Sequence, residues 1–173
     1  MKREAGKFVF TVFAFLVLTA FASVSEAKTI YVPDDYAKIQ WAVDNATAGD
    51  TIIVRDGIYY ENVDVNKQLT LKSENSSANC IILAANSMDH ALEITANYVN
   101  ISGLTVTGAN GEGILAGIYL NNANYCNISN NSIYGNSNGI YIYHSNYNNL
   151  VDNTVLHSDG GIGHLIIVSQ KTK

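Results

Sequence analysis

Charged residues and proline are scarce in this sequence. Only 14% of the 173 residues are charged and one is a proline, whereas an average globular chain has about 25% charged residues. The 10 basic and 15 acidic residues give a formal net charge of −5 at pH 7. Because no basic excess is available to neutralise phosphates, the sequence argues against a nucleic-acid-binding protein.

Cysteine is almost as rare, with Cys80 and Cys126 as the two examples. Two cysteines in an exported protein are a candidate disulfide. The coil assignment given below places them on different faces about two coils apart, whereas a disulfide needs Cα atoms within roughly 7 Å. We therefore predict two small core residues with free thiols.

The N-terminal segment has the pattern of a signal peptide. Lys2, Arg3 and Lys7 precede the uncharged apolar run Phe8–Ala22, which has the length of a signal-peptide core and is short for a membrane span. A small-residue motif then predicts cleavage after Ala27. An uncleaved N-terminal anchor helix is the alternative, and in both cases the rest of the chain is exported from the cytoplasm.

A repeat of 22 residues dominates the second half of the chain. Gly117-Ile118-Tyr119-Leu120 returns as Gly139-Ile140-Tyr141-Ile142, and the segment 125–133 returns at the same offset as 147–155. An earlier, longer copy spans residues 98–106. A period in the low twenties with three short strand signals per repeat is typical of one coil of a parallel β-helix. The Leu-x-x-Leu-x-Leu framework of a leucine-rich repeat is missing.

Each repeat divides into three strands in which every second residue is apolar. The predicted inward residues are Val63/Val65, Leu92/Ile94, Ile118/Leu120 and Ile140/Ile142 in the first strand, Leu69/Leu71, Val99/Ile101, Cys126/Ile128 and Leu150 in the second, and Ile81 or Ile82, Leu104/Val106, Ile133 and Val155 in the third. These residues are expected to stack in columns about 4.8 Å apart, over about four coils. The longer early copies place their extra residues in loops at 74–79 and 108–113.

Asn131 and Asn153 fall at one corner of successive coils. An inward asparagine at a bend satisfies neighbouring backbone groups and bonds to its stacked equivalent. We therefore predict a structural role for both residues.

The segment before the coils is expected to cap the β-helix. Asp34-Asp35 precede residues 36–46, where Ile39, Ala42, Val43 and Ala46 have helical spacing. Such a helix covers the open edge of the first coil, and Gly49-Asp50 then lead into a strand at Thr51–Val54. The predicted organisation is a signal peptide at 1–27, a cap strand and helix at 28–50, and coils at 51–163.

The end of the chain departs from the coil pattern. Gly161-Ile162 keep the 22-residue register, and His164 then falls where Ile142 points inward. Residues 164–173 are therefore expected to be an irregular or truncated tail.

The N-terminal coils carry a family resemblance. The run Ile30-Tyr31-Val32-Pro33, Ile39-Gln40-Trp41-Ala42-Val43, Ala48-Gly49-Asp50-Thr51-Ile52-Ile53-Val54, Gly57-Ile58-Tyr59 and Glu61-Asn62-Val63 resembles the opening of NosD-like β-helix proteins, which are abundant among archaeal cell-surface proteins, and of pectin methylesterases. The later Gly-Ile-Tyr-Leu and Asn-x-Ile-x-x-Asn coils look like NosD-type and carbohydrate-binding repeats.

This resemblance spans about residues 29–163 and implies an all-β, right-handed parallel β-helix of the pectin-lyase type. It implies little about activity, since the scaffold hosts many functions. Members usually continue into more coils or anchoring modules, so the chain is expected to be C-terminally truncated, with further coils or domains missing.

The outward residues of the first strand form a column of Asp64, Glu93, Tyr119 and Tyr141. Asp64 and Glu93 are expected within about 5–6 Å of each other, which suits acid/base catalysis on a glycoside or a Ca²⁺ ion. Tyr119, Tyr141 and Tyr143 are expected to offer flat ring faces to sugars. The alternative is a set of solvated strand residues, with tyrosine favoured by its β-propensity.

Two further chemistries have weaker support in the sequence. Polysaccharide cleavage calls for a placed cation, and Arg55, the only arginine after residue 27, is expected near the cap. The NosD name carries an association with copper; Met88 and His90 share one loop, and His144, His157, His164 and the two cysteines are the other soft-ligand candidates. No cofactor is expected, with Ca²⁺ or copper as alternatives.

These observations favour a secreted or cell-surface NosD-like module that recognises carbohydrate or serves as an envelope building block. Its expected partners are a polysaccharide or glycan and the cell envelope. A glycoside hydrolase or lyase using Asp64 and Glu93 is the first alternative. A copper-associated maturation factor is the second.

Overall fold

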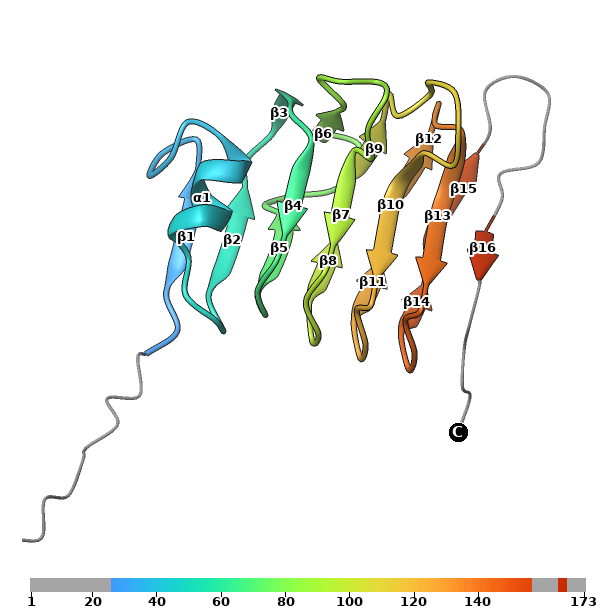
Figure 1. Cartoon of the computed structure of the whole chain (residues 1–173). Coiled ribbons are helices and arrows are strands. Elements are labelled where there is room, and N and C mark those ends of the chain that lie inside the picture. The colour runs from blue at the N-terminus through green and yellow to red at the C-terminus, as the bar shows by residue number, and fades with distance from the viewer. Residues whose placement is uncertain (1–25, 157–164, 168–173) are drawn as a thin grey trace, which may run out of the picture.

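The computed structural model describes residues 26–156 and the strand at residues 165–167. The predicted parallel β-helix is confirmed, and Figure 1 shows its coils stacked from the N-terminal helix to the last strand. The elements are β1 (Thr29–Val32), α1 (Ile39–Asn45), β2 (Thr51–Val54), β3 (Gly57–Tyr60), β4 (Val63–Val65), β5 (Thr70–Ser73), β6 (Cys80–Leu83), β7 (Leu92–Ile94), β8 (Asn100–Ser102), β9 (Thr105–Thr107), β10 (Ala116–Asn121), β11 (Asn127–Ser129), β12 (Ser132–Tyr134), β13 (Asn138–Tyr143), β14 (Asn149–Val151), β15 (Thr154–Leu156) and β16 (Leu165–Ile167).

Three parallel sheets form the walls of the solenoid. Sheet A has the strand order β1-β2-β5-β8-β11-β14, sheet B has β15-β12-β9-β6-β3, and sheet C has β16-β13-β10-β7-β4. The chain passes from A to B to C in each coil, and every strand pairs with its equivalent one coil away. The predicted loops separate β5 from β6 and β9 from β10.

The predicted inward columns are confirmed by the register. In sheet C, Leu92 and Ile118 pair with each other, and Ile118 pairs with Ile140. In sheet B the column contains the fully buried Ile82, whereas Ile81 is only partly buried. The aliphatic columns of the three sheets meet in one continuous core, which supplies most of the favourable free energy of folding.

The Gly-Ile-Tyr repeat has a packing explanation. A Cβ added at Gly117 would lie 2.6 Å from Ile133 Cγ2, and one added at Gly139 would meet Val155 Cγ1 at 2.1 Å. Each glycine is the second residue of a sheet C strand, at a point where the strand packs against sheet B. A side chain at either position would therefore displace a core residue.

The prediction of about four coils is too low. It counts the residues from Val63 onward, whereas β2 and β3 already form the walls of an earlier coil and β1 adds a further strand to sheet A. The prediction for residues 164–173 is also wrong in part, because Leu165–Ile167 form β16.

The 22-residue register is not kept at this last strand. Ile140 pairs with Leu165 and Ile142 pairs with Ile167, 25 residues further along the chain in each case. The register partner of Ile142 is therefore Ile167 rather than the expected His164. His164 itself, His157 and the predicted signal peptide up to residue 25 lie outside the described residues.

The capping helix is shorter than predicted and is capped from elsewhere. It begins at Ile39 rather than at residue 36, and the carboxylate of Glu61 accepts hydrogen bonds from the backbone N–H groups of Ile39 (2.9 Å) and Gln40 (3.0 Å). Asp34 and Asp35 instead bind Arg55 and the N–H of Tyr31. No helix among the described residues has the length and hydropathy to cross a membrane.

Asn131 and Asn153 lie at the corner between sheets A and B. Asn131 is 2% exposed, and its side chain accepts from the N–H of Leu104 (3.0 Å) and donates to Ile101 O (3.3 Å) and Asn153 Oδ1 (2.9 Å). Asn153 in turn donates to the carbonyl of Ile128. These hydrogen bonds satisfy backbone groups that the turn would leave unpaired in the core.

Both cysteines have free, buried thiols, as predicted. Cys80 lies in β6 and Cys126 precedes β11, so they belong to different sheets. Burial raises the pKa of the Cys80 thiol to about 12 and also raises that of Cys126. Both therefore remain protonated at neutral pH and pack as small apolar groups.

Replacing Asn131 by alanine is expected to destabilise the chain by about 2–4 kcal/mol, because the buried N–H of Leu104 loses its acceptor and two further hydrogen bonds disappear. The matched control is Asn130→Gly, since Asn130 is exposed and its φ of 56° suits glycine. Urea unfolding measures the free energy of unfolding of both variants. Equal, small losses of this free energy in the two variants would contradict the structural role of Asn131.

Neither thiol of the native protein is expected to react with a thiol reagent such as DTNB at pH 8 within minutes. Both should react once the chain is unfolded in guanidinium chloride, because unfolding exposes them and lowers their pKa values to the ordinary range. Rapid labelling of the native protein, or fewer than two thiols after unfolding, would be inconsistent with this structure.

Candidate functional site

The outward face of sheet C presents the predicted column of polar and aromatic residues. Asp64 on β4 pairs with Glu93 on β7, Glu93 with Tyr119 on β10, and Tyr119 with Tyr141 on β13. The side chains alternate with the core residues on the same strands, because strand neighbours point to opposite faces. All four predicted column residues therefore lie side by side on one face.

The two carboxylates of this column have different surroundings. Burial, followed by the charges of Asp89 and Asp44, raises the pKa of Asp64. Glu93 accepts a hydrogen bond from the Asn121 amide (3.3 Å). The two acids occupy neighbouring strands in register, and the column itself contains no cationic residue.

The tyrosine rings of this face stack on one another. The Tyr119 ring lies between His90, at 4.2 Å between centroids, and Tyr141, at 5.1 Å, with interplanar angles of 27° and 13°. Both faces of the Tyr119 ring are therefore covered by neighbouring rings, so a sugar would meet the edge of this ring rather than a flat face. Its edge and hydroxyl remain outward.

Tyr143 differs from the other two predicted tyrosines. Its ring is tilted by 44° from that of Tyr141 and meets His144 edge to face at 4.0 Å. No parallel ring stacks on it among residues 26–156. Its register partner on β10 is Asn121, the donor to Glu93, so Tyr143, Asn121 and Glu93 form one polar cluster on adjoining strands.

Among the copper-ligand candidates that the structure describes, His90 and the two cysteines are engaged in other ways. His90 Nδ1 accepts the N–H of Ala116 (3.0 Å), and burial lowers the pKa of its ring. A neutral ring held in this way carries its proton on Nε2, which blocks that nitrogen as a metal ligand. Met88 is 59% exposed, and the thiols are protonated and buried.

No group of three or more His, Cys, Asp or Glu side chains that could hold a metal ion occurs in the part of the chain that the structure describes. His90 and the two thiols are thus engaged or protonated, and a copper or Ca²⁺ site stays a prediction.

Arg55 lies near the cap, as predicted, and is fully engaged there. Its guanidinium forms ion pairs with Asp34 (2.6 Å) and with Glu74 (2.5 Å). It lies on the sheet A side of the first coils, directly after β2. It is therefore not placed to assist chemistry on sheet C.

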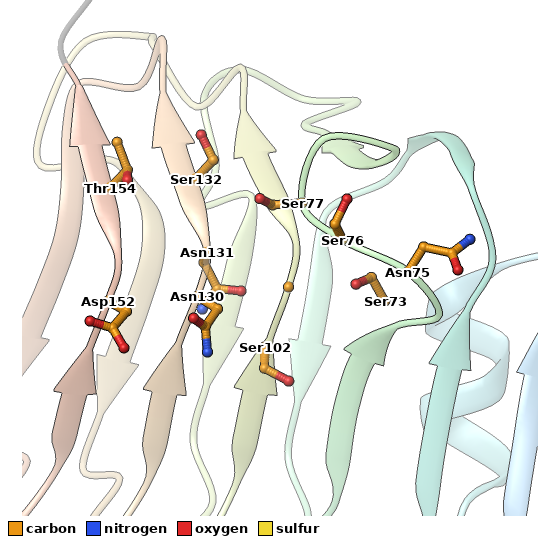
Figure 2. Close-up of a pocket in the computed structure, with 11 residues that line it drawn as sticks. Ser73, Asn75, Ser76, Ser77, Ser102, Asn130, Asn131, Ser132, Asp152 and Thr154 are labelled. Atoms are coloured by element: carbon orange, nitrogen blue, oxygen red, sulfur yellow. The ribbon is translucent and has the colours of Figure 1, made fainter.

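A polar groove at the corner between sheets A and B was not predicted. It has a volume of about 530 Å³ and is lined by Ser73, Asn75, Ser76, Ser77, Ser102, Gly103, Asn130, Asn131, Ser132, Asp152 and Thr154. Figure 2 shows Asn130 and Asp152 side by side on neighbouring turns, with Ser132 and Thr154 on the strands that follow. The 22-residue spacing within each of these pairs is the signal that could have identified it.

A second aromatic stack was also missed. Tyr98, Tyr125 and Tyr147 each precede a sheet A strand with φ of 58°, and their rings stack at 5.2 and 5.0 Å. The Asn-Tyr pair that recurs at 97–98, 124–125 and 146–147 is the sequence pattern that could have predicted this stack. Because the ring faces cover each other, the stack holds successive coils together rather than offering a sugar platform.

Several solved structures share this fold. An alginate lyase from Paenibacillus superposes with a TM-score of 0.62 at 24% identity, covering 74% of this chain and 44% of that one. The pectin methylesterase PemA from Erwinia chrysanthemi gives a TM-score of 0.56 at 18% identity, covering 78% of this chain and 51% of that one. These likenesses show the β-helix fold alone.

One relative of this chain is a cell-surface protein. A cell surface glycoprotein from Methanothermus fervidus is 39% identical over 118 residues, which is 67% of this chain and 18% of the glycoprotein. The chain thus spans less than a fifth of the length of that relative.

The model of one protein family matches most of the coils. It is described as periplasmic copper-binding protein (NosD), and it matches residues 43–172, beginning within α1. The chain belongs to the NosD family.

Proposed function

We propose that this chain is a non-catalytic glycan-binding module of the cell envelope and that it binds neutral polysaccharide through the outward face of sheet C. The observation that carries the proposal is the polar cluster of Glu93, Asn121 and Tyr143 on three adjoining strands. The family and the cell-surface glycoprotein relative support an envelope location.

The chemistry of this cluster suits sugar hydroxyl groups. The Glu93 carboxylate accepts hydrogen bonds, the Asn121 amide both donates and accepts, and the tyrosine hydroxyl does both. Adjacent sugar hydroxyls are recognised by such paired donors and acceptors. Tyr143 adds an aromatic ring on which no other ring of residues 26–156 stacks in parallel, and the stacked Tyr119 and Tyr141 contribute their ring edges.

The charge of the face selects against acidic polysaccharides. Asp64 and Glu93 are the charged members of the column, so a uronate would be repelled rather than paired. An arginine or lysine that could neutralise a carboxylate is missing from the column. Neutral glycans are therefore the expected ligands.

Glycoside cleavage is the second candidate function, and one observation favours it. The raised pKa of Asp64 beside Glu93 is what a general acid next to a second carboxylate would need. However, Asp64 is exposed overall, so the burial that raises its pKa is only partial, and the charges of Asp89 and Asp44 add to the shift. The column of Asp64, Glu93, Tyr119 and Tyr141 also contains no cation of the kind that lyase chemistry uses, so we prefer binding without turnover.

Replacing Tyr143 by alanine is expected to weaken binding of a neutral polysaccharide about fivefold to tenfold, because the ring loses its contact with the sugar. Affinity electrophoresis in gels containing glucan, mannan or galactan measures this. The matched control is Tyr60→Ala, since Tyr60 is 66% exposed on sheet B and should leave binding unchanged. Equal retardation of wild type and Tyr143→Ala would contradict the proposed face.

The chain is expected to produce neither reducing ends nor unsaturated uronates from neutral or acidic polysaccharides over a day. Reducing-sugar and ultraviolet absorbance assays measure the two products. Turnover that disappears in both Asp64→Asn and Glu93→Gln would replace the binding function with the catalytic one. Turnover that persists in both variants would mean that Asp64 and Glu93 do not catalyse it and would indicate a contaminating enzyme.

A further inference from the structure

We infer that the polar groove at the corner between sheets A and B is a second binding site, one that takes a neutral oligosaccharide. It lies at a different corner of the solenoid from the sheet C face and stands independently of the function proposed there. We call this groove, with its lining from Ser73 to Thr154, the corner groove. Its volume of about 530 Å³ falls within the roughly 300–1,000 Å³ of small-molecule sites.

The corner groove is built from positions that repeat once per coil. Ser102, Ser129 and Val151 pair in register across sheet A, and the next residue in each coil is Gly103, Asn130 or Asp152. These three residues have φ of 68°, 56° and 53°. Because the backbone turns in the same way in each coil, the three residues point outward in one row along the solenoid. Ser132 and Thr154 pair in the adjoining row on sheet B.

The loop 74–79 forms the wall of the groove and is fixed at both ends. The Asn75 amide donates to both carboxylate oxygens of Asp56, at 3.1 and 3.0 Å. Thr105 Oγ1 donates to the carbonyl of Ser77 at 2.7 Å. The wall is therefore held in place before a ligand arrives, which lowers the entropic cost of binding.

A buried hydroxyl opens into the groove floor. Ser73 is 9% exposed and lines the groove, and its hydroxyl has no hydrogen-bond partner among the described residues. Gly103 leaves room beside it, since a Cβ at that position would lie 2.4 Å from Ser73 Oγ. An unpaired buried hydroxyl is costly, and a ligand hydroxyl at the groove floor would satisfy it.

The lining also distinguishes between ligand classes. Every side chain in it is a hydroxyl, an amide or the single carboxylate of Asp152, so an apolar ligand finds no complementary group and an anionic ligand finds no cationic partner. One carboxylate is also too few for a divalent cation without further acidic ligands. Asp152 and Asn130 make no side-chain hydrogen bond within residues 26–156 and are thus available to sugar hydroxyls.

The length of the groove indicates more than one sugar ring. It extends from the coil of Ser73 to that of Asp152, three coil steps along the axis. At about 4.8 Å per step this is roughly 14 Å. The ligand class is therefore a neutral oligosaccharide of several linked residues.

Two variants test the corner groove without forcing the backbone. Asp152→Gly removes the carboxylate at a position whose φ suits glycine. The double variant Ser73→Ala with Gly103→Asn fills the floor; asparagine tolerates this φ, and without Ser73 Oγ the nearest Ser73 atom is its Cβ, at 3.6 Å from the new Cβ. Circular dichroism and thermal melting establish that both are folded.

The measurement is a site-resolved NMR titration of the chain with glucan, mannan and galactan hexasaccharides, and with an oligogalacturonate of the same length. At least one neutral hexasaccharide should shift the backbone amides of Ser102, Asn130 and Ser132. The apparent Kd at these amides should rise at least tenfold in Asp152→Gly, be unmeasurable in the double variant, and be unchanged in Tyr143→Ala.

Three results would overturn the inference: no shift at the groove amides with any neutral hexasaccharide, shifts that persist in both groove variants, or a preference for the oligogalacturonate. Failure at the sheet C face would instead appear as a lack of shifts at Asn121 and Tyr143. The two proposals are therefore tested by the amide shifts of different residues.

Discussion

The hydrogen bonds that each coil makes with the coil before it are the constraint on which this structure depends. A parallel ladder repeats every residue position once per coil, so a residue type that recurs at the repeat becomes a column. Inward columns of aliphatic residues then form the core, and outward ones form the faces. Glu93, Tyr119 and Tyr141 meet on sheet C for this reason, and Asn130 and Asp152 meet at the corner groove for the same reason.

Stacking has a second consequence, which changes the interpretation of the aromatic residues. Identical rings in register lie about 5 Å apart and pack face to face, as Tyr119 does with Tyr141 and Tyr125 with Tyr147. A column of tyrosines thus stabilises the coils while removing most ring faces from solvent. Ligand recognition then falls to the residues that break the stack, such as Tyr143, and to the polar side chains beside them.

The repeat made the strands predictable, and features without a repeat were missed. The alternation around Ile118 and Ile140 predicts both columns and faces, since it follows directly from the pleat. The 22-residue period fails at Ile142, whose partner is Ile167, because only the pairing itself shows where the next strand resumes. Glu61 as the cap of α1 and the floor formed by Ser73 and Gly103 depend on contacts between distant positions, which no local pattern reveals.

Recognition of neutral glycans by the walls of a β-helix is the central claim, and a crystal structure of the chain with a bound neutral hexasaccharide tests it most directly. Sugar density is expected against Glu93, Asn121 and Tyr143 on sheet C or within the corner groove, with hydroxyl groups at hydrogen-bond distance from the side chains there. Density confined to sheet B, or a crystal saturated with sugar that shows none at either place, would contradict it.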